Sequence, residues 1–556
     1  MKKLKIKYAA AIGLVLLLAA VVRFYRLGSH TSPYWEEAAL GYDAYSIWKT
    51  GRDHHGHRLP IVAFESFGDW KPSLYFYAAS PFVGLLGLNT FSVRLPSAIC
   101  GVMIVLGVGL LTKLVYEHIR DQSDLKRLDK FTPFQVQITA MLLTAINPWA
   151  VHFSRAAWEV NLAACLTLWG VWFGLRFVFK QKKIVNLASS ALLLILSLYA
   201  YHAMRIIAPL LGLGIVLLLM IRSGFNRVVK QHGLKLVVLL AAAAVLVWPV
   251  VVQLNSNQIS QRFQETSLFS QIEVIERSNN YRRLSDNSVR SRIFYHRYLL
   301  FGREIISNFL VHFNLDFLFV SGDANPRHSI QYYGHFYHLE FILLLLGTAF
   351  LVGKRTPIKW FFGFWLTAGI VPAALTKTTP HALRILPTLP VFIAAITLGL
   401  LVLLSWLKTV IIQAANKLNL CLSKKAVGAA VVLVLLACYL LEFLGYAHYY
   451  LLIYPDKYAS DWQSGYQQMI KQVVSLQRQH PQYQVYISRS QGRPAMYYWF
   501  FTKTNPKQVQ AAADSVKKDQ GEFLEYQQIQ FQEPTGQPQS INAVYTEQGW
   551  KVYTNP

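Results

Sequence analysis

Long apolar runs recur along the first 450 residues and restrict the fold more than any other feature of the chain. A helix of about 20 apolar residues spans the hydrocarbon core of a bilayer, and it satisfies its own backbone polar groups there. The chain is 54% hydrophobic and 15% charged, a composition typical of polytopic membrane proteins. We predict an all-α polytopic membrane protein of about 11 transmembrane helices, near 8–22, 95–115, 135–152, 161–178, 187–204, 206–221, 236–253, 336–353, 360–375, 385–407 and 426–449.

The net charge of +26 is unevenly distributed between these runs. Lysines and arginines gather in alternate connections, which a cytoplasmic N-terminus would place on the cytoplasmic side, as the positive-inside rule requires. The charge is therefore a topology signal, and we predict no nucleic-acid partner. The basic segments are 2–7, 113–130, 176–183, 222–235, 354–359 and 408–425.

The same orientation places three long segments outside the cytoplasm. These are a first outer loop at 23–94, a second at 254–335, and the tail after Pro455, where apolar runs end. In the tail, 461–478 has helical spacing, whereas 483–488 and 543–554 alternate as strands do. We predict a membrane domain over 1–454, an extracytoplasmic α/β domain over 455–556, and a multi-pass protein of the plasma membrane.

The first outer loop is rich in acidic and aromatic residues directly after the first span. We predict a surface helix over 33–48, with Ser32 as N-cap and Pro33 as its first residue. Glu36 and Glu37 lie in its first turn, and Asp43 is seven residues further, near the face of Glu36. A carboxylate there can act as a general base, although acids in a first turn also simply stabilise helices.

Cations near the outer membrane surface form a second group of candidates. Lys71 precedes the apolar run 74–88, which we predict to be an interfacial helix containing Pro81. A lysine at this depth can bind the phosphate of an anionic lipid or extend its ammonium group to water. Three arginines lie at outer span ends, where guanidinium groups suit a phosphate: Arg155, Arg205 and Arg384. An ion pair between Arg155 and Glu159 is the simpler explanation for that arginine.

Histidines leave a divalent metal open, because His and carboxylate ligands together suit such an ion. They occur at 54, 55, 57, 328, 335, 338 and 381, without the fixed spacing of a known metal motif. We group His381 with Lys71 and the three arginines as candidate ligands of a lipid phosphate. Further residues predicted to contact substrate are Asp43, Asp53, Asp69, Glu159, Asp323, Arg327 and His328. There is no P-loop, GxGxxG or GxSxG element, which fits a donor presented by the membrane.

Several segments together resemble the GT-C superfamily of polyprenyl-phosphate-sugar-dependent glycosyltransferases. The chain is most similar to the bacterial protein O-mannosyltransferase and aminoarabinose-transferase group. The segments are WEEAALGYDAY, TGRDHHGHRLP, GDWKPSLYFYAASPFVGLLGLNTFSVRLPSA, HFSRAAWEVN, SLYAYHAMRIIAPL, FVSGDANPRHS and LTKTTPHALRILP.

This resemblance implies an inverting sugar transfer at the outer face, from a carrier such as undecaprenyl phosphate. By position, Glu36 takes the role of the family's catalytic aspartate, Lys71 that of the lysine in its K-P motif, and Arg384 that of an arginine near the lipid phosphate. The family usually has Asp-Glu where this chain has Glu-Glu, so Glu37 stays a second candidate for the base. Trp70 replaces an acid that binds metal in some relatives.

Three function classes remain open at this stage. The first is transfer of a monosaccharide to a hydroxyl of a protein, a lipid or a cell-wall glycan. The second is a flippase or transporter of lipid-linked sugars, which would favour inverted repeats and polar residues near mid-span. The third is a polymerase or ligase of diphosphate-linked oligosaccharides.

Overall fold

A computed structural model describes residues 2–122, 131–180, 183–223, 225–254, 266–420 and 422–556. Each predicted span overlaps a helix in these ranges, and the span predicted at 135–152 is divided in two at Pro148. The helices are α1 (Lys2–Phe24), α4 (Thr90–Gln122), α5 (Pro133–Ile146), α7 (Glu159–Phe179), α8 (Ile184–Leu198), α9 (Met204–Ser223), α10 (Phe225–Leu254), α15 (Glu340–Val352), α16 (Pro357–Ala374), α18 (Leu389–Lys417) and α19 (Lys424–His448). Residues 123–130 of the predicted inside connection and 255–265 of the predicted second outer loop lie outside the described ranges.

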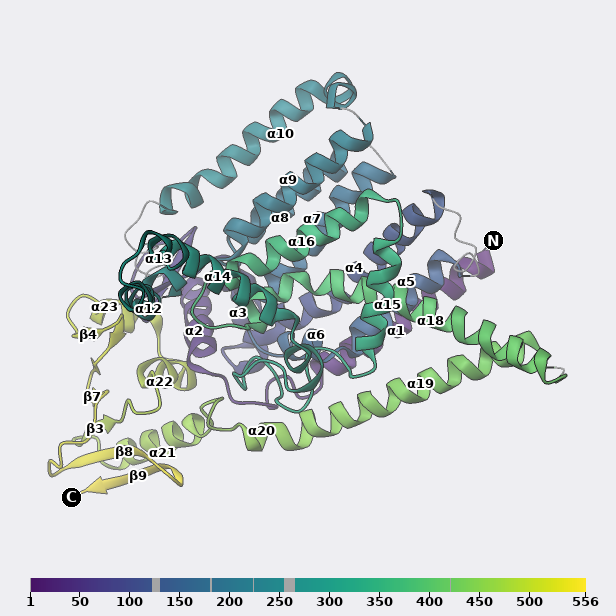
Figure 1. Ribbon diagram of the computed structural model, residues 1–556. Helices are drawn as coiled ribbons and strands as arrows, with labels where there is room; N and C mark the ends of the chain where they lie inside the picture. Colours follow the sequence, from purple (N-terminus) through teal and green to yellow (C-terminus); the bar gives the residue numbers. More distant parts are fainter. Residues whose placement is uncertain (1, 123–130, 181–182, 224, 255–265, 421) are drawn as a thin grey trace.

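Length and composition qualify seven helical stretches of the described chain to cross a membrane. The helices α5, α8 and α15 are apolar but shorter. The long helices α10 and α19 lie at two edges of the helical layer (Figure 1) and expose side chains such as Leu240 and Leu441. Exposed leucines on long helices are expected where the surrounding solvent is lipid. The chain is therefore a multi-pass membrane protein with an all-α membrane part.

Close packing of small residues joins two central helices, α15 and α18. A Cβ atom added at Gly347 would lie 1.8 Å from the carbonyl oxygen of Ala395, and one added at Gly399 would lie 1.9 Å from that of Leu343. The two backbones can approach this closely only because both positions lack a side chain. This crossing fixes the position of α18, which follows the segment carrying His381.

The first outer loop contains α2 (Trp35–Thr50), the hairpin of β1 (Ala63–Ser66) and β2 (Asp69–Pro72), and α3 (Leu74–Leu86). The predicted start of α2 at Pro33 with Ser32 as cap is wrong by two residues, because Tyr34 is the N-cap. The Glu37 carboxylate accepts the Tyr34 backbone N–H at 3.4 Å and so fixes the first turn at Trp35. The helix α3 includes Pro81 and covers the predicted interfacial segment.

Further short elements lie between the long helices. They are α6 (Pro148–Phe153), η1 (Leu268–Ser270), α12 (Ile272–Leu284), α13 (Val289–Phe294), α14 (Arg297–Leu310), η2 (Val311–Phe313), η3 (Asp316–Val320), α17 (Ala382–Ile385) and η4 (Leu386–Thr388). In Figure 1, α12 to α14 lie at the same end of the helical layer as α2, and the N-terminus lies at the opposite end. The polar loops thus gather at one end of the membrane helices.

The region after α19, here called the C-terminal region (residues 449–556), is a small α/β structure. A five-stranded sheet has the order β6-β7-β3-β8-β9, and β3 is parallel to both β7 and β8. The predicted helix and strands correspond to α21, β3 and the β8–β9 hairpin. The elements are η5 (Tyr449–Ile453), α20 (Tyr454–Lys457), α21 (Tyr466–Gln479), β3 (Gln484–Ile487), α22 (Pro494–Thr502), α23 (Pro506–Ala512), β4 (Lys518–Asp519), β5 (Glu522–Phe523), β6 (Glu525–Tyr526), β7 (Ile529–Gln530), β8 (Ser540–Thr546) and β9 (Gly549–Asn555).

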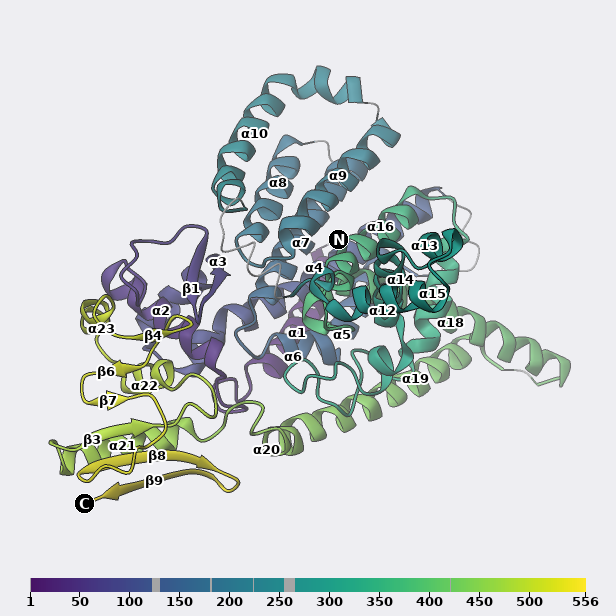
Figure 2. The same cartoon turned by 60° about the vertical axis from the view of Figure 1, so that its left-hand side comes forward.

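The C-terminal region packs directly against α2 (Figure 2). The Gln463 side chain accepts the Trp35 backbone N–H at 2.9 Å, and the Tyr497 hydroxyl donates to the Pro33 carbonyl at 2.9 Å. These contacts place the C-terminal region over the start of α2, where the predicted catalytic acids lie. The domain boundary at residue 454 stays a prediction.

Candidate active site

Glu36 and Lys71 form an ion pair at the beginning of α2. The Lys71 ammonium lies 2.5 Å from Oε1 of Glu36, and 13% of the Lys71 side chain and 35% of the Glu36 side chain are exposed. The β1–β2 hairpin holds Lys71 opposite Phe64, three residues before α3. Burial alone would raise the pKa of Glu36, but the Lys71 ammonium and, more weakly, Arg327 outweigh it and lower the pKa below its usual 4.5. The pair thus places an ionised carboxylate beside an ammonium group.

Glu37 points the other way, into the protein. Its side chain is 1% exposed. The carboxylate accepts hydrogen bonds from Nε and Nη2 of Arg94 at 2.8 and 2.7 Å and from the Ala157 backbone N–H at 2.7 Å. A carboxylate held by these three donors and by Tyr34 has its oxygens occupied by structural partners. This geometry favours Glu36 over Glu37 as the base.

Asp43 is buried rather than turned toward substrate. Its Oδ1 atom accepts the backbone N–H of His54 at 2.9 Å and lies 2.7 Å from His54 Nδ1. The predicted carboxylate face of Glu36 and Asp43 is therefore wrong, because Asp43 fastens the loop after α2 to the helix. Burial raises the pKa of Asp43 despite the His54 contact.

Asp53 also has a local role. Its carboxylate accepts the His57 backbone N–H at 2.8 Å and contacts His57 Nδ1 at 2.9 Å. The histidines at 54 and 57 are thus paired with different carboxylates, and neither Asp43 nor Asp53 is open to substrate. Asp69 lies close enough to Glu36 for its negative charge to oppose, in small part, the lowering of the Glu36 pKa.

A loop from the second outer connection covers the beginning of α2. Its Arg327 guanidinium carbon lies 5.4 Å from the centre of the Tyr34 ring and 5.8 Å from that of Trp35. The Arg327 carbonyl is 2.8 Å from Nε2 of His152, which fixes the loop to α6. This stacking holds a positive charge near Glu36.

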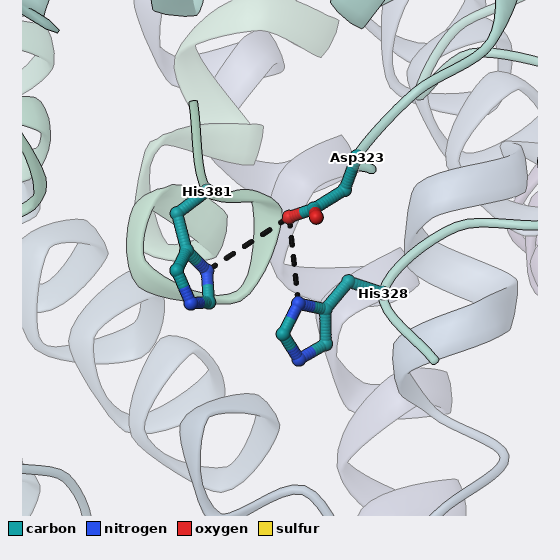
Figure 3. Close-up of side chains that lie close together, drawn as sticks. All are labelled: Asp323, His328 and His381. Carbon is teal, nitrogen blue, oxygen red and sulfur yellow. Dashed lines mark ion pairs between the residues drawn. The ribbon is translucent and has the colours of Figure 1, made fainter. Parts of the chain in front are cut away.

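Asp323, His328 and His381 converge from two loops, as Figure 3 shows. Nδ1 of His328 lies 3.4 Å, and Nδ1 of His381 3.9 Å, from Oδ2 of Asp323. Within the described ranges this is the one group of three such side chains whose ligand atoms all lie within 4.8 Å of one another. The same carboxylate oxygen accepts the Ala382 backbone N–H at 2.7 Å.

The electrostatics of this cluster favour a charged aspartate and a neutral histidine. Burial would raise the pKa of Asp323, but His328 and His381 lower it overall. Burial and the Arg384 guanidinium lower the pKa of His381. Both histidine Nδ1 atoms are buried and lack a hydrogen-bond partner among the described residues. An anionic oxygen facing two bare imidazole nitrogens is a suitable donor set for a divalent cation.

The three span-end arginines have separate contacts. Arg155 is buried and donates to the carbonyls of Val22 and Tyr25 at 2.6 and 2.7 Å, rather than pairing with Glu159 as the simpler explanation predicted. Buried carbonyls at the end of α1 need donors, and the guanidinium supplies them. Glu159 begins α7 near Tyr34, whose pKa it helps to raise after burial and the other acids.

Arg205 donates to the Gln253 side chain at 3.0 Å, at the end of α10. Arg384 donates to the hydroxyls of Thr376 and Thr378 and to the Thr378 carbonyl. Of the three, Arg384 is the one beside the Asp323 cluster, because it is three residues after His381. A donor-binding role for Arg155 and Arg205 stays a prediction.

Sequence reasoning missed Arg94 and the arginines of the C-terminal region. Arg94 is fully buried in α4, and an arginine inside an apolar span is a recognisable signal. Arg489 and Arg493 line a cavity over α2 together with Trp35 and Arg327. Their position could not be read from spacing, since more than 400 residues separate them from α2.

Comparison with protein-family models and with curated protein sequences gives no match. The structure is similar to the archaeal oligosaccharyltransferase AglB from Archaeoglobus fulgidus in complex with an inhibitory peptide and a dolichol-phosphate. The TM-score is 0.50 at 13% identity, over 91% of this chain and 65% of that one. It is also similar to ArnT from Cupriavidus metallidurans bound to undecaprenyl phosphate, with a TM-score of 0.50 at 13% identity, over 97% of this chain and 93% of that one. This chain thus spans about two thirds of the AglB chain and nearly all of ArnT. The likeness shows that the chain shares the fold of these two solved structures, which agrees with the fold that the sequence resemblance implies.

Proposed function

We propose that the protein is an integral-membrane glycosyltransferase. It moves a monosaccharide, with inversion, from a polyprenyl-phosphate carrier to an acceptor hydroxyl on the outer face of the plasma membrane. The observation that carries this proposal is the Glu36–Lys71 pair, a base and a cation side by side at the polar end of the membrane helices. The two similar structures hold dolichol-phosphate and undecaprenyl phosphate, which supports a lipid-phosphate donor here.

In the proposed reaction Lys71 binds the donor phosphate, and Arg384 contributes a second positive charge. Glu36 accepts the proton of the acceptor hydroxyl, whose oxygen forms a bond to C1 of the sugar. The bond between C1 and the phosphate oxygen breaks, and polyprenyl phosphate leaves with the electron pair. Stabilising this leaving phosphate is the main electrostatic task of the site.

Donor binding also activates the base. A phosphate that takes the Lys71 ammonium removes the main opposing charge from Glu36. Burial then raises the pKa of Glu36, and a stronger base accepts the acceptor proton more readily. Substrate binding and base activation are coupled through one lysine.

We also propose that Asp323, His328 and His381 hold a divalent cation. Zinc–ligand bonds of 2.0–2.1 Å place tetrahedral ligands about 3.3 Å apart, so the separations of 3.4 and 3.9 Å need only small side-chain movements. Such an ion would neutralise phosphate charge. Arg384, close to His381, would add its positive charge to that of the ion.

The decisive experiment supplies purified protein in lipid nanodiscs with synthetic donors. We expect release of polyprenyl phosphate from a monosaccharide on a monophosphate carrier, and at least a hundredfold loss in Glu36→Gln, the size of a general-base contribution. Glu547→Gln, on an exposed turn, is the matched control. Turnover of only diphosphate-linked oligosaccharides would instead identify the polymerase or ligase class. Lipid movement between leaflets without bond cleavage would identify a flippase.

A further inference from the structure

A cavity of about 1040 Å³ lies between the membrane part and the C-terminal region. Trp35 and Arg327 line one wall, and Arg489, Gly492 and Arg493 line the other. This volume is at the upper end of the range for single-ligand sites, so it has room for several units of a chain. Most of the remaining lining carries amide or hydroxyl groups: Asn325, Ser460, Gln463, Ser490, Gln491 and Gln520.

Arg327 offers this cavity a charge without a carboxylate partner in the described part of the chain. It is half-buried, and its guanidinium lies over the faces of Tyr34 and Trp35. Stacking on two rings orients the guanidinium and leaves its N–H donors available for an oxyanion. Arg327 also lies near enough to Glu36 to lower the pKa of that carboxylate, which places it beside the proposed base.

The opposite wall has two further arginines that share acidic partners. Arg489 contacts Asp519 at 2.8 Å and Glu522 at 3.2 Å, and Arg493 contacts Glu522 at 3.5 Å. Glu522 is buried, and burial raises its pKa to about 7, so its negative charge is incomplete at neutral pH. With Asp461 and Asp519 as the acidic lining, the cavity keeps an excess of positive charge.

We infer that this cavity is the acceptor site, and that it selects a glycan or polyol chain carrying phosphate or carboxylate groups. The inference rests on the glycosyltransferase function proposed above. Guanidinium groups on both walls would bind successive oxyanions, while amides and hydroxyls contact the neutral units. A phospholipid headgroup is a less suitable occupant, because neither wall offers a continuous apolar surface for acyl chains.

The test is binding of defined oligomers to the full chain in zwitterionic nanodiscs. The probes are hexagalacturonate, a glycerol-phosphate hexamer and the uncharged maltohexaose. We expect at least one anionic hexamer to bind about tenfold more tightly than maltohexaose, the effect of one charge-assisted hydrogen bond. Arg327→Gln should remove this preference and Arg327→Lys should restore part of it. Neither change breaks a recorded ion pair. Arg478→Gln, exposed on α21, should leave binding unchanged.

Equal binding of charged and neutral hexamers, or an unchanged preference in Arg327→Gln, would overturn the inference. Loss of hexamer binding when phosphatidylglycerol is added to the nanodiscs would assign the cavity to a lipid instead. Failure of the proposed glycosyltransferase function can be distinguished from failure of this inference about the acceptor. Anionic hexamers that bind to a protein that never cleaves the lipid donor would refute the proposed function, whereas donor cleavage without the anionic preference refutes only the acceptor class.

Discussion

Glu37 and Arg94 form a two-point ion pair with both side chains excluded from solvent, at 2.7 Å between Oε2 and Nη2 and 2.8 Å between Oε1 and Nε. Arg94 also donates to the carbonyls of Leu27, Thr31 and Ser32. The pair thereby joins the first turn of α2 to α4 and to the chain leaving α1. Adjacent glutamates in one helical turn have opposite environments, one structural and one facing the proposed substrates.

The first prediction separates these two glutamates by stability. Glu37→Gln should destabilise the protein by about 3–5 kcal/mol, because it leaves the Arg94 guanidinium buried without its counter-charge. Glu36→Gln should change the unfolding temperature little, since its side chain is partly exposed, while lowering transfer at least a hundredfold. Thermal unfolding in detergent measures both. A stable Glu37→Gln protein would show that Arg94 finds another partner, and would remove the assignment of Glu37 as structural.

The second prediction concerns the acid limb of the pH profile. The base form of Glu36 is the carboxylate, so kcat/KM should fall only as the pH drops through its lowered pKa, below 4.5. Lys71→Met removes the main cause of that lowering, and burial then raises the pKa. The acid limb should therefore move to higher pH, in addition to any loss from weaker donor binding. An unshifted limb in Lys71→Met would show that another group is the base.

Much of the membrane part could be predicted from the sequence, because hydrocarbon imposes a simple rule on segment length. Each predicted span corresponds to a helix, from α1 to α19. Local chemistry predicted less well at the start of α2, where an ordinary cap at Ser32 yields to the tertiary Glu37–Arg94 contact. The C-terminal strands were visible as alternation, but their sheet order depends on long-range pairing.

The site was only partly predictable for the same reason. Glu36 and Lys71 were separate candidates in one loop, and no sequence pattern predicted their ion pair. Asp323, His328 and His381 converge although no spacing rule links them. Asp43 and Arg155 carried the same sequence signals as true candidates, yet both are used internally. Residue type and approximate depth do not distinguish a side chain that binds its own backbone from one that faces a ligand.

The third prediction tests the metal site by metal content. Protein purified with zinc and desalted should retain about one equivalent, and His328→Ala or His381→Ala should lose it. His338→Ala is the matched control, because His338 pairs with Glu442 outside the cluster. Added zinc should also raise the unfolding temperature of the wild-type chain but not of the two cluster variants. Equal zinc content in all four proteins, measured by mass spectrometry, would exclude this cluster as the site.

The fourth prediction concerns the contact between the C-terminal region and α2. Gly492 has a φ of +114°, and a Cβ added there would lie 2.3 Å from the Trp35 ring. Gly492→Ala should cost about 1 kcal/mol for the backbone and a further 1–3 kcal/mol for the overlap. Gly536→Ala is the control, since Gly536 also has a positive φ of +73° but has open space around its Cβ position. Equal destabilisation of the two variants in thermal unfolding would mean that Trp35 yields without cost.

The last prediction concerns orientation, on which the proposed chemistry depends. The N-terminal end of α1 and the ends at which α18 and α19 meet lie opposite α2 and α12 to α14 along the helices (Figure 1). Lysines lie at these ends of the three helices, and the positive-inside rule assigns such an end to the cytoplasm. A cysteine at Gln548, on the exposed β8–β9 turn, should react with a membrane-impermeant maleimide in intact cells. A cysteine at exposed Asn419, between α18 and α19, should react only after permeabilisation. The reverse pattern would put Glu36 and Lys71 on the cytoplasmic side, where a donor displayed on the outer leaflet could not reach them.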